Sequence, residues 1–343
     1  MSDGRHPLLE LTRVRLLEFF REPEAIFWIF VFPVLMTLTL GIAFRSPADA
    51  RIPVAVLAGG DRVAQALERD GGFRTTVMTD DRARAALRDG EVHLVVAAGP
   101  PPRFVFDPTR PESRVARLAV DAALQRDAGR VDVWTADEER VVAPGSRYVD
   151  WLVPGLLGMN VMGTSLWGIG FSIVNARMQK LLQRFMATPM RRWHYLVAQV
   201  LARMTFLALE VAILIGFAHV VFGVPVRGSA AGLATVCVVG ALSFAGLGLL
   251  VASRARTIEA VSGLLNVVML PMWVGSGVFF SSKNFPAFAQ PFLDALPLTA
   301  LNQSLRGLML EGLPLAGVAP QLLILAAWGA LAFLLALRLF RWR

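Results

Sequence analysis

Residues 25–44 read AIFWIFVFPVLMTLTLGIAF and contain no charged side chain. About 20 helical residues are needed to cross the hydrocarbon core of a bilayer, so this stretch predicts a membrane-spanning helix. The whole chain agrees with that interpretation, because 55% of its residues are hydrophobic and only 17% are charged. Soluble domains carry about 25% charged residues. We therefore expect a polytopic membrane protein.

Further apolar stretches bring the expected number of spans to six. A cleaved signal peptide is the alternative for residues 25–44, but the run is longer than a signal core and glutamates precede it, which favours an uncleaved anchor. The predicted fold class is an α-helical polytopic membrane protein with six transmembrane helices and a small α/β extracytoplasmic domain between the first two. The other five spans are predicted at 148–174, 195–221, 229–252, 258–280 and 313–337.

The distribution of Lys and Arg beside the spans predicts their orientation, since cytoplasmic flanks are enriched in both. With both termini in the cytoplasm, the outside segments hold only Arg227, Lys283 and Arg306. The inside segments then hold Arg5, Arg13, Arg15, Arg21, Arg177, Lys180, Arg184, Arg191, Arg192, Arg254, Arg256, Arg338, Arg341 and Arg343. We expect a bacterial-type inner membrane, with residues 338–343 as a basic cytoplasmic tail.

The first segment, 1–24, is predicted to contain an amphipathic helix. In the stretch HPLLELTRVRLLEFFREP (6–23), apolar side chains gather on one helical arc and charged ones on the other. We expect this helix to lie on the cytoplasmic membrane surface, with a frayed tail as the alternative.

Residues 45–147 form the predicted soluble domain. Strand-like stretches such as IPVAVLA (52–58) alternate with helical ones such as DDRARAALRDG (80–90), where Thr79 can cap the helix and Gly90 can end it. This alternation indicates a small α/β domain. Gly59-Gly60 lacks the pattern of a nucleotide-binding loop, because the chain has no Gly-Lys pair.

Charge and residue usage exclude several functions. Residues 45–147 hold equal numbers of Arg and acidic residues, so the net charge of +8 belongs to the membrane-associated remainder and does not indicate nucleic-acid binding. Cys237 is the single cysteine and the four histidines are scattered. No catalytic or metal-binding residues are predicted, and no enzymatic activity is expected of this chain.

The segment between the second and third spans, 175–192, is more elaborate than a connecting loop. On a helical wheel its apolar residues form one arc and its basic residues the other, and Thr188-Pro189 is typical of a helix restart. We expect a docking element for a cytoplasmic partner, with a plain membrane-surface helix as the alternative. The predicted contact residues are Arg177, Lys180, Leu181, Leu182, Arg184, Phe185, Met186, Thr188 and Pro189.

Two stretches carry a resemblance to a known family. RMQKLLQRFMATPMRRWHYLVAQVL (177–201) and LNVVMLPMWVGSGVFFSSKNFPAFAQPFLDALPLTALNQSLRGLMLEG (265–312) are similar to segments of ABC-2-type transporter permeases. The large insert after the first span resembles the drug- and lipid-exporting branch. SSKNF (281–285) departs from the pattern, because many relatives have a proline soon after the paired aromatics.

The resemblance implies a permease that dimerises and binds cytoplasmic ABC ATPase subunits, which would hold the ATP and Mg, with no cofactor in this chain. It implies a hydrophobic or amphiphilic substrate and a coupling role for the 177–188 helix. Residues 281–312 are too short in continuous apolar length for a span, so we expect an external re-entrant or broken helical segment. Its marker residues are Pro286, Pro291, Pro297 and Arg306.

Two charges lie inside the third predicted span. Arg203 and Glu210 are seven residues apart, on roughly the same helix face. A charged carboxylate in the membrane is costly unless it is paired, hydrated or protonated. Lining of the substrate path and a structural pair both remain open. Two other functions are weighed: a proton-coupled secondary transporter using Glu210, and a membrane-anchored sensor or docking protein.

Overall fold

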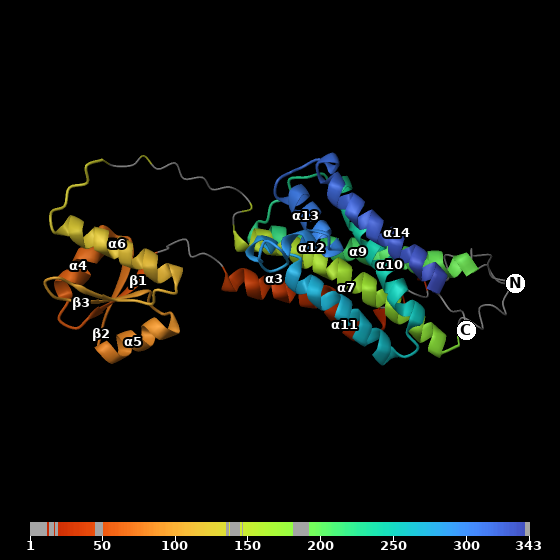
Figure 1. Ribbon diagram of the computed structural model, residues 1–343, viewed down its shortest axis with the longest axis horizontal. Coiled ribbons are helices and arrows are strands. Elements are labelled where there is room, and N and C mark those ends of the chain that lie inside the picture. Colours follow the sequence, from red (N-terminus) through yellow and green to blue (C-terminus); the bar gives the residue numbers. More distant parts are fainter. Residues whose placement is uncertain are drawn as a thin grey trace. The chain divides into compact units, whose positions relative to one another are not determined.

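The structure, a computed structural model, describes residues 12–13, 17, 20–44, 51–134, 137, 145, 147–180 and 192–339. The chain divides into two compact units (Figure 1). One unit is formed by Ser46–Val141, and the other by Met1–Arg45 together with Val142–Arg343. We describe each unit by itself.

The smaller unit is an α/β sandwich around a four-stranded sheet. The strand order is β2-β1-β3-β4, with β1 parallel to β2 and β3, and with β4 antiparallel to β3. The strands and helices form where the sequence predicts them. Their bounds are β1 (Ile52–Leu57), α4 (Asp61–Asp70), β2 (Phe73–Met78), α5 (Asp80–Asp89), β3 (Leu94–Ala97), β4 (Arg103–Val105) and α6 (Pro111–Asp127).

Alternation along β1 separates the two faces of this sheet. Val54 and Val56 pack with side chains of α4 and α6, whereas Ala55, between them, packs with side chains of α5. Figure 1 accordingly shows α4 and α6 on one face of the sheet and α5 on the other. Successive strand residues point to opposite faces, so the consecutive apolar residues of β1 make both faces of the sheet apolar. The sheet is therefore buried on both sides.

Glycines end two helices of this unit as the sequence predicts. Gly71 follows α4 with φ 79°, and Gly90 follows α5 with φ 78°, both in the left-handed region that favours glycine. The prediction for Thr79 is only half right. It occupies the N-cap position of α5 with an extended backbone, but its side chain makes no capping hydrogen bond.

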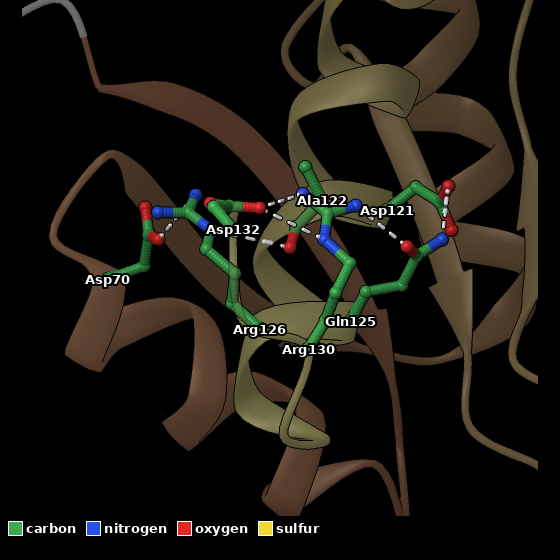
Figure 2. Close-up of polar contacts among 7 residues, drawn as sticks. All are labelled: Asp70, Asp121, Ala122, Gln125, Arg126, Arg130 and Asp132. Atoms are coloured by element: carbon green, nitrogen blue, oxygen red, sulfur yellow. Dashed lines mark hydrogen bonds and ion pairs between the residues drawn. The ribbon is translucent and has the colours of Figure 1, made fainter. Parts of the chain in front are cut away.

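Polar contacts fasten α6 to α4 where both helices end. Arg126 pairs with Asp70 at 3.0 Å and Arg69 with Asp127 at 2.9 Å. Figure 2 shows the first pair and the chain of contacts beyond it, in which Arg130 donates to Gln125 and Asp132. Exposed ion pairs contribute little individually, but two crossed pairs fix the relative position of the helix ends.

The larger unit is helical. Among the residues that the structure describes, five helical segments are long and apolar enough to cross a membrane: Tyr148–Met178, Leu201–Phe222, Ala230–Arg254, Ile258–Gly275 and Leu315–Leu339. The first predicted span appears as a shorter apolar helix, Phe27–Ala43, so the sixth span stays a prediction. The elements are α2 (Pro23–Ile26), η1 (Phe27–Val31), α3 (Phe32–Ala43), α7 (Tyr148–Met178), α9 (Arg192–Phe222), α10 (Ala230–Arg254), α11 (Ile258–Gly275), η2 (Ser282–Asn284), α12 (Gln290–Asp294), α13 (Pro297–Met309), η3 (Leu315–Val318) and α14 (Ala319–Leu339).

α11 is shorter than the predicted 258–280. It ends at Gly275, and Gly277 then adopts φ 71°, which an α-helix does not permit. The small residues at 275–277 therefore end the helix. The remainder of the predicted span, residues 276–280, forms turns and bends instead of helix.

The predicted broken segment, 281–312, contains two short helices and one longer one. α13, which begins at Pro297, is buried at every position except Gln303. Pro297 suits the first helical turn, where its missing N–H leaves no hydrogen bond unmade. Pro291 likewise lies at the start of α12, whereas Pro286 precedes that helix. The external location of the segment stays a prediction.

Glycines allow α10 to lie close to both of its neighbours. A Cβ on Gly248 would come within 2.8 Å of the Leu166 carbonyl oxygen of α7, and one on Gly246 within 3.0 Å of the Gly329 carbonyl oxygen of α14. Such close backbone approach is how helices pack in membranes, where the apolar environment gives no hydrophobic drive for association. α10 is thus held between α7 and α14.

Candidate functional site

The predicted intramembrane charges lie together as an ion pair. Arg203 Nη1 and Glu210 Oε2, both on α9, are 3.1 Å apart, and the side chains are 9% and 0% exposed. A spacing of two helical turns lets the long arginine side chain reach the carboxylate. Both charges are thereby paired within the buried interior of the bundle, as one of the two sequence-based interpretations proposed.

Arg203 also crosses to α7. Its guanidinium donates to the Ser165 Oγ at 3.3 Å and to the Thr164 Oγ1. The Thr164 hydroxyl in turn donates to the Asn160 carbonyl at 2.7 Å. The sequence offered the pair as one of two interpretations but did not indicate these acceptors, since small hydroxyl residues are common in membrane helices and carry no distinct signal.

A second polar contact joins α7 to η1. Pro33 has no N–H to donate to the Ile29 carbonyl four residues earlier, and the helix opens into the wider η1 turn beside it. Asn160 Nδ2 donates to that carbonyl at 3.1 Å. In an apolar environment an unsatisfied carbonyl is costly, so Asn160 supplies the hydrogen bond that Pro33 removes.

Arg306 occupies the junction of three elements. It lies on α13, is 7% exposed, and stacks on the Trp151 ring with its Cζ 3.4 Å from the ring centroid. Its Nη2 donates to the Trp151 carbonyl of α7 at 3.1 Å and to the Gly277 carbonyl after α11. The residue predicted as an outside positive charge is therefore a buried clamp between α13, α7 and the end of α11.

Glycines of α7 make room for this junction. A Cβ on Gly155 would lie 2.6 Å from the Val278 carbonyl oxygen and 3.0 Å from Arg306 Nη2. A Cβ on Gly158 would overlap the Asn302 Oδ1. Asn302 Nδ2 donates to the Ser276 carbonyl at 2.9 Å, which gives α13 a second hold on the end of α11.

Arginines at the two ends of α7 bind the carbonyl ends of other helices. At the first end, Arg147 pairs with the buried Asp150 at 2.8 Å and donates to the carbonyl oxygens of Phe222 and Gly223, where α9 ends. At the second end, Arg177 donates to the carbonyl oxygens of Ala252 and Ala255, where α10 ends. Helix C-termini carry unsatisfied carbonyls and partial negative charge, so cations are stabilised there.

Of the predicted coupling residues, the structure describes Arg177 and Lys180. Arg177 is half-buried against α10, and Lys180 is exposed just beyond α7, with φ 54°. α7 itself extends to Met178, past the predicted end at 174. The remaining predicted contacts lie outside the described residues: Leu181, Leu182, Arg184, Phe185, Met186, Thr188 and Pro189. Of the predicted N-terminal amphipathic helix, only residues 12–13, 17 and 20–24 are described.

In the α/β unit, Asp107 has local hydrogen-bond partners. Asp107 accepts hydrogen bonds from the hydroxyl and the N–H of Thr109, which hold the pKa of its carboxyl below the ordinary value. That geometry stabilises the turn before α6. In the part of the chain that the structure describes, no three His, Cys, Asp or Glu side chains form a group that could hold a metal ion.

The outer faces of the helical unit define its class. Large apolar side chains are exposed along α11 and α14, among them Val267 at 70% and Leu323 at 70%. Exposed apolar surface of this extent is rare in soluble monomers, and it fits a lipid environment. A glycine-packed helical bundle with buried, paired charges is a multi-pass membrane protein.

Comparison with known proteins gives the family. Residues 117–310 match the ABC-2 type transporter family, which is more than half of the chain, so the chain belongs to that family. ABC transporter G family member 20 of Dictyostelium discoideum is 26% identical over 174 residues, which cover 50% of this chain and 24% of that protein. The chain thus spans about a quarter of that relative's length. The family's membrane domain is a transport subunit and not an ATPase.

Proposed function

We propose that this chain is the transmembrane permease subunit of an ATP-driven exporter. It would move a hydrophobic or amphiphilic substrate, such as a drug, an antibiotic or a lipid, out of the cytoplasm or the inner leaflet. The match of residues 117–310 to the ABC-2 type transporter family carries this proposal, and the name of the Dictyostelium relative agrees with it.

The proposal includes partners that the chain lacks. A separate ABC ATPase would bind ATP and Mg and dock at the coupling segment, and a second permease subunit would complete the translocation path. The apolar arc around Phe185 and Met186, flanked by Lys180 and Arg184, is the predicted docking surface. An apolar ridge with basic edges suits a partner that covers the ridge and offers acidic groups at its rim.

Six spans with both termini inside remain part of the proposal. α2, η1 and α3 form an unbroken helical run over residues 23–43. At about 1.5 Å per residue this run reaches about 30 Å, the thickness of the hydrocarbon core. A sixth span of this length would give an even number of crossings, with the α/β unit and the coupling segment on opposite sides of the membrane.

This topology predicts which side of the membrane reacts with thiol reagents. With Cys237→Ala, the chain has no other cysteine, so one introduced thiol reports alone. We expect Glu112→Cys, on the exposed start of α6, to react with a membrane-impermeant maleimide in spheroplasts prepared with intact inner membranes. Gln179→Cys, exposed after α7, should react only after permeabilisation. Equal labelling of both sites in intact spheroplasts would rule the topology out.

Docking of an ATPase is the direct test of function. We co-express the tagged chain with its candidate ABC ATPase, purify the complex in nanodiscs, and measure recovered ATPase and ATP turnover. Phe185→Ala with Met186→Ala should weaken ATPase binding by about thirtyfold, seen as reduced recovery, because two apolar contacts of 1 kcal/mol or so each are lost. Membrane insertion should be unchanged.

The matched control is Gln183→Ala, on the opposite arc of the same predicted helix. It should recover as much ATPase as the unmodified chain. If no ABC ATPase associates and transport follows a proton gradient instead, the exporter proposal fails. If the double variant binds the ATPase normally, the proposal stands but the docking surface is misplaced.

A further inference from the structure

Arg177 links the last turn of α7 to the turn between α10 and α11. Its Nη1 donates to the Ala252 carbonyl at 3.1 Å and to the Ala255 carbonyl at 2.6 Å. Ala252 belongs to the last turn of α10, and Ala255 is its C-cap residue. A single guanidinium therefore holds the end of one helix against the end of another.

The acceptors explain why this position suits an arginine. The last carbonyls of a helix have no intrahelical donor, and they carry the negative end of the helix dipole. A charged donor forms a stronger hydrogen bond with them than a neutral one does. The side chains of Arg254 and Arg256, at the same end of α10, are both exposed.

α7 and α10 are also in contact further along their length. Gly248 of α10 lies against the backbone of Leu166, and Gly170 of α7 lies 3.7 Å, measured from an added Cβ, from the Gly248 carbonyl oxygen. Arg177 is about two turns beyond Gly170 on α7. The two helices are thus joined at two separated points, and a pair of rods joined at two points moves as one body.

The same rigidity extends to α14. A Cβ on Gly329 of α14 would lie 3.0 Å from the Ser243 Cα of α10. α10 is therefore fixed on two sides, to α7 and to α14. A displacement of the end of α7 can reach α10 and, through it, the start of α11 and the length of α14.

We infer that Arg177 is a positioning residue that carries movement of the coupling segment to the α10–α11 turn. This inference rests on the proposed function, because the movement would come from the ATPase docked beside Lys180. Arg177 itself would not touch the ATPase, in contrast to the coupling role expected from the sequence. It keeps the distance between the α10–α11 turn and the end of α7 constant during the ATP cycle.

The test measures whether the two ends stay together when ATP is bound. In a Cys237→Ala background, Gln179→Cys and Arg256→Cys, both exposed, carry spin labels in the full permease–ATPase complex in nanodiscs. Dipolar broadening in continuous-wave EPR reports their separation, without nucleotide and after trapping with ATP and vanadate. With Arg177 present, we expect the same broadening in both states.

Replacing the Arg177 guanidinium should separate the end of α7 from the end of α10 only in the complex trapped with ATP and vanadate. Arg177→Ala should keep the broadening without nucleotide and lose it after trapping, whereas Arg177→Lys should lose only part of it. Arg254→Ala, which removes an exposed charge from the same helix end, should behave as the parent does. ATPase recovery should be equal in all four samples.

Other outcomes would overturn the inference. Unchanged broadening of the trapped Arg177→Ala complex would overturn the inference, as would a change of separation in the parent. Loss of broadening already without nucleotide would reduce Arg177 to a structural cap and overturn it too. Failure of any ABC ATPase to associate is a separate result, since it removes the proposed function on which the inference rests.

Discussion

Arg306→Ala should strongly lower the stability of the helical bundle. The substitution removes the ring contact with Trp151 and leaves the carbonyl oxygens of Trp151 and Gly277 without this donor. Hydrogen bonds from charged donors contribute about 1.5–3 kcal/mol each, and a stacked cation adds about 1 kcal/mol. We expect a loss of about 3 kcal/mol or more, seen as a thermal midpoint lowered by about 10 °C in nanodiscs.

Two further variants separate charge from geometry at this junction. Arg306→Lys keeps the charge but loses the planar group that stacks on Trp151 while it donates to two carbonyls, so an intermediate drop is expected. Arg227→Ala removes an exposed arginine from the nearby loop and should change the stability by no more than about 0.5 kcal/mol. A lysine variant as stable as the parent would contradict the conclusion that Arg306 holds α13, α7 and the end of α11 together.

Breaking the Arg203–Glu210 pair should have the second large effect. Glu210→Met leaves the Arg203 charge buried without its carboxylate, and Arg203→Met leaves the carboxylate without its cation. Removal of one member of a buried pair costs about 3–5 kcal/mol, whereas replacement of both by apolar residues of similar volume is often nearly neutral. The double variant should therefore unfold close to the parent temperature, while both single variants unfold earlier.

This double-mutant cycle also bears on how transport is powered. If the pair is structural, the double variant retains ATPase association and ATP turnover together with its stability. If Glu210 were a proton site, the double variant would be folded but would lose proton-linked transport. Additive losses, with the double variant destabilised by the sum of the two single variants, would show that the two charges are not energetically coupled.

The α/β unit was the most predictable part of the fold. Its strands and helices alternate over short distances, and local signals such as Gly71 and Gly90 mark where helices end. The Thr79 capping hydrogen bond was the local error, since a residue type predicts a position but not the rotamer. Periodicity also located the membrane helices, but it placed the end of α11 too late, because apolar residues continue beyond the glycine that stops it.

The polar junctions of the bundle were less predictable. The Arg203–Glu210 pair could be anticipated because both residues lie on one helix. Arg306 could not be placed, because its acceptors are main-chain carbonyls of Trp151 and Gly277, far away along the chain. Every residue has a carbonyl, so a sequence contains no pattern that singles out which one an arginine will bind.

Two of the arginine contacts in the bundle have an unusual tolerance to acid. Arg177 and Arg306 bind carbonyl oxygens, and neither a guanidinium nor an amide carbonyl changes its protonation state between neutral and mildly acidic pH. Mild acidification would therefore leave intact the contacts by which Arg177 and Arg306 hold the helix ends.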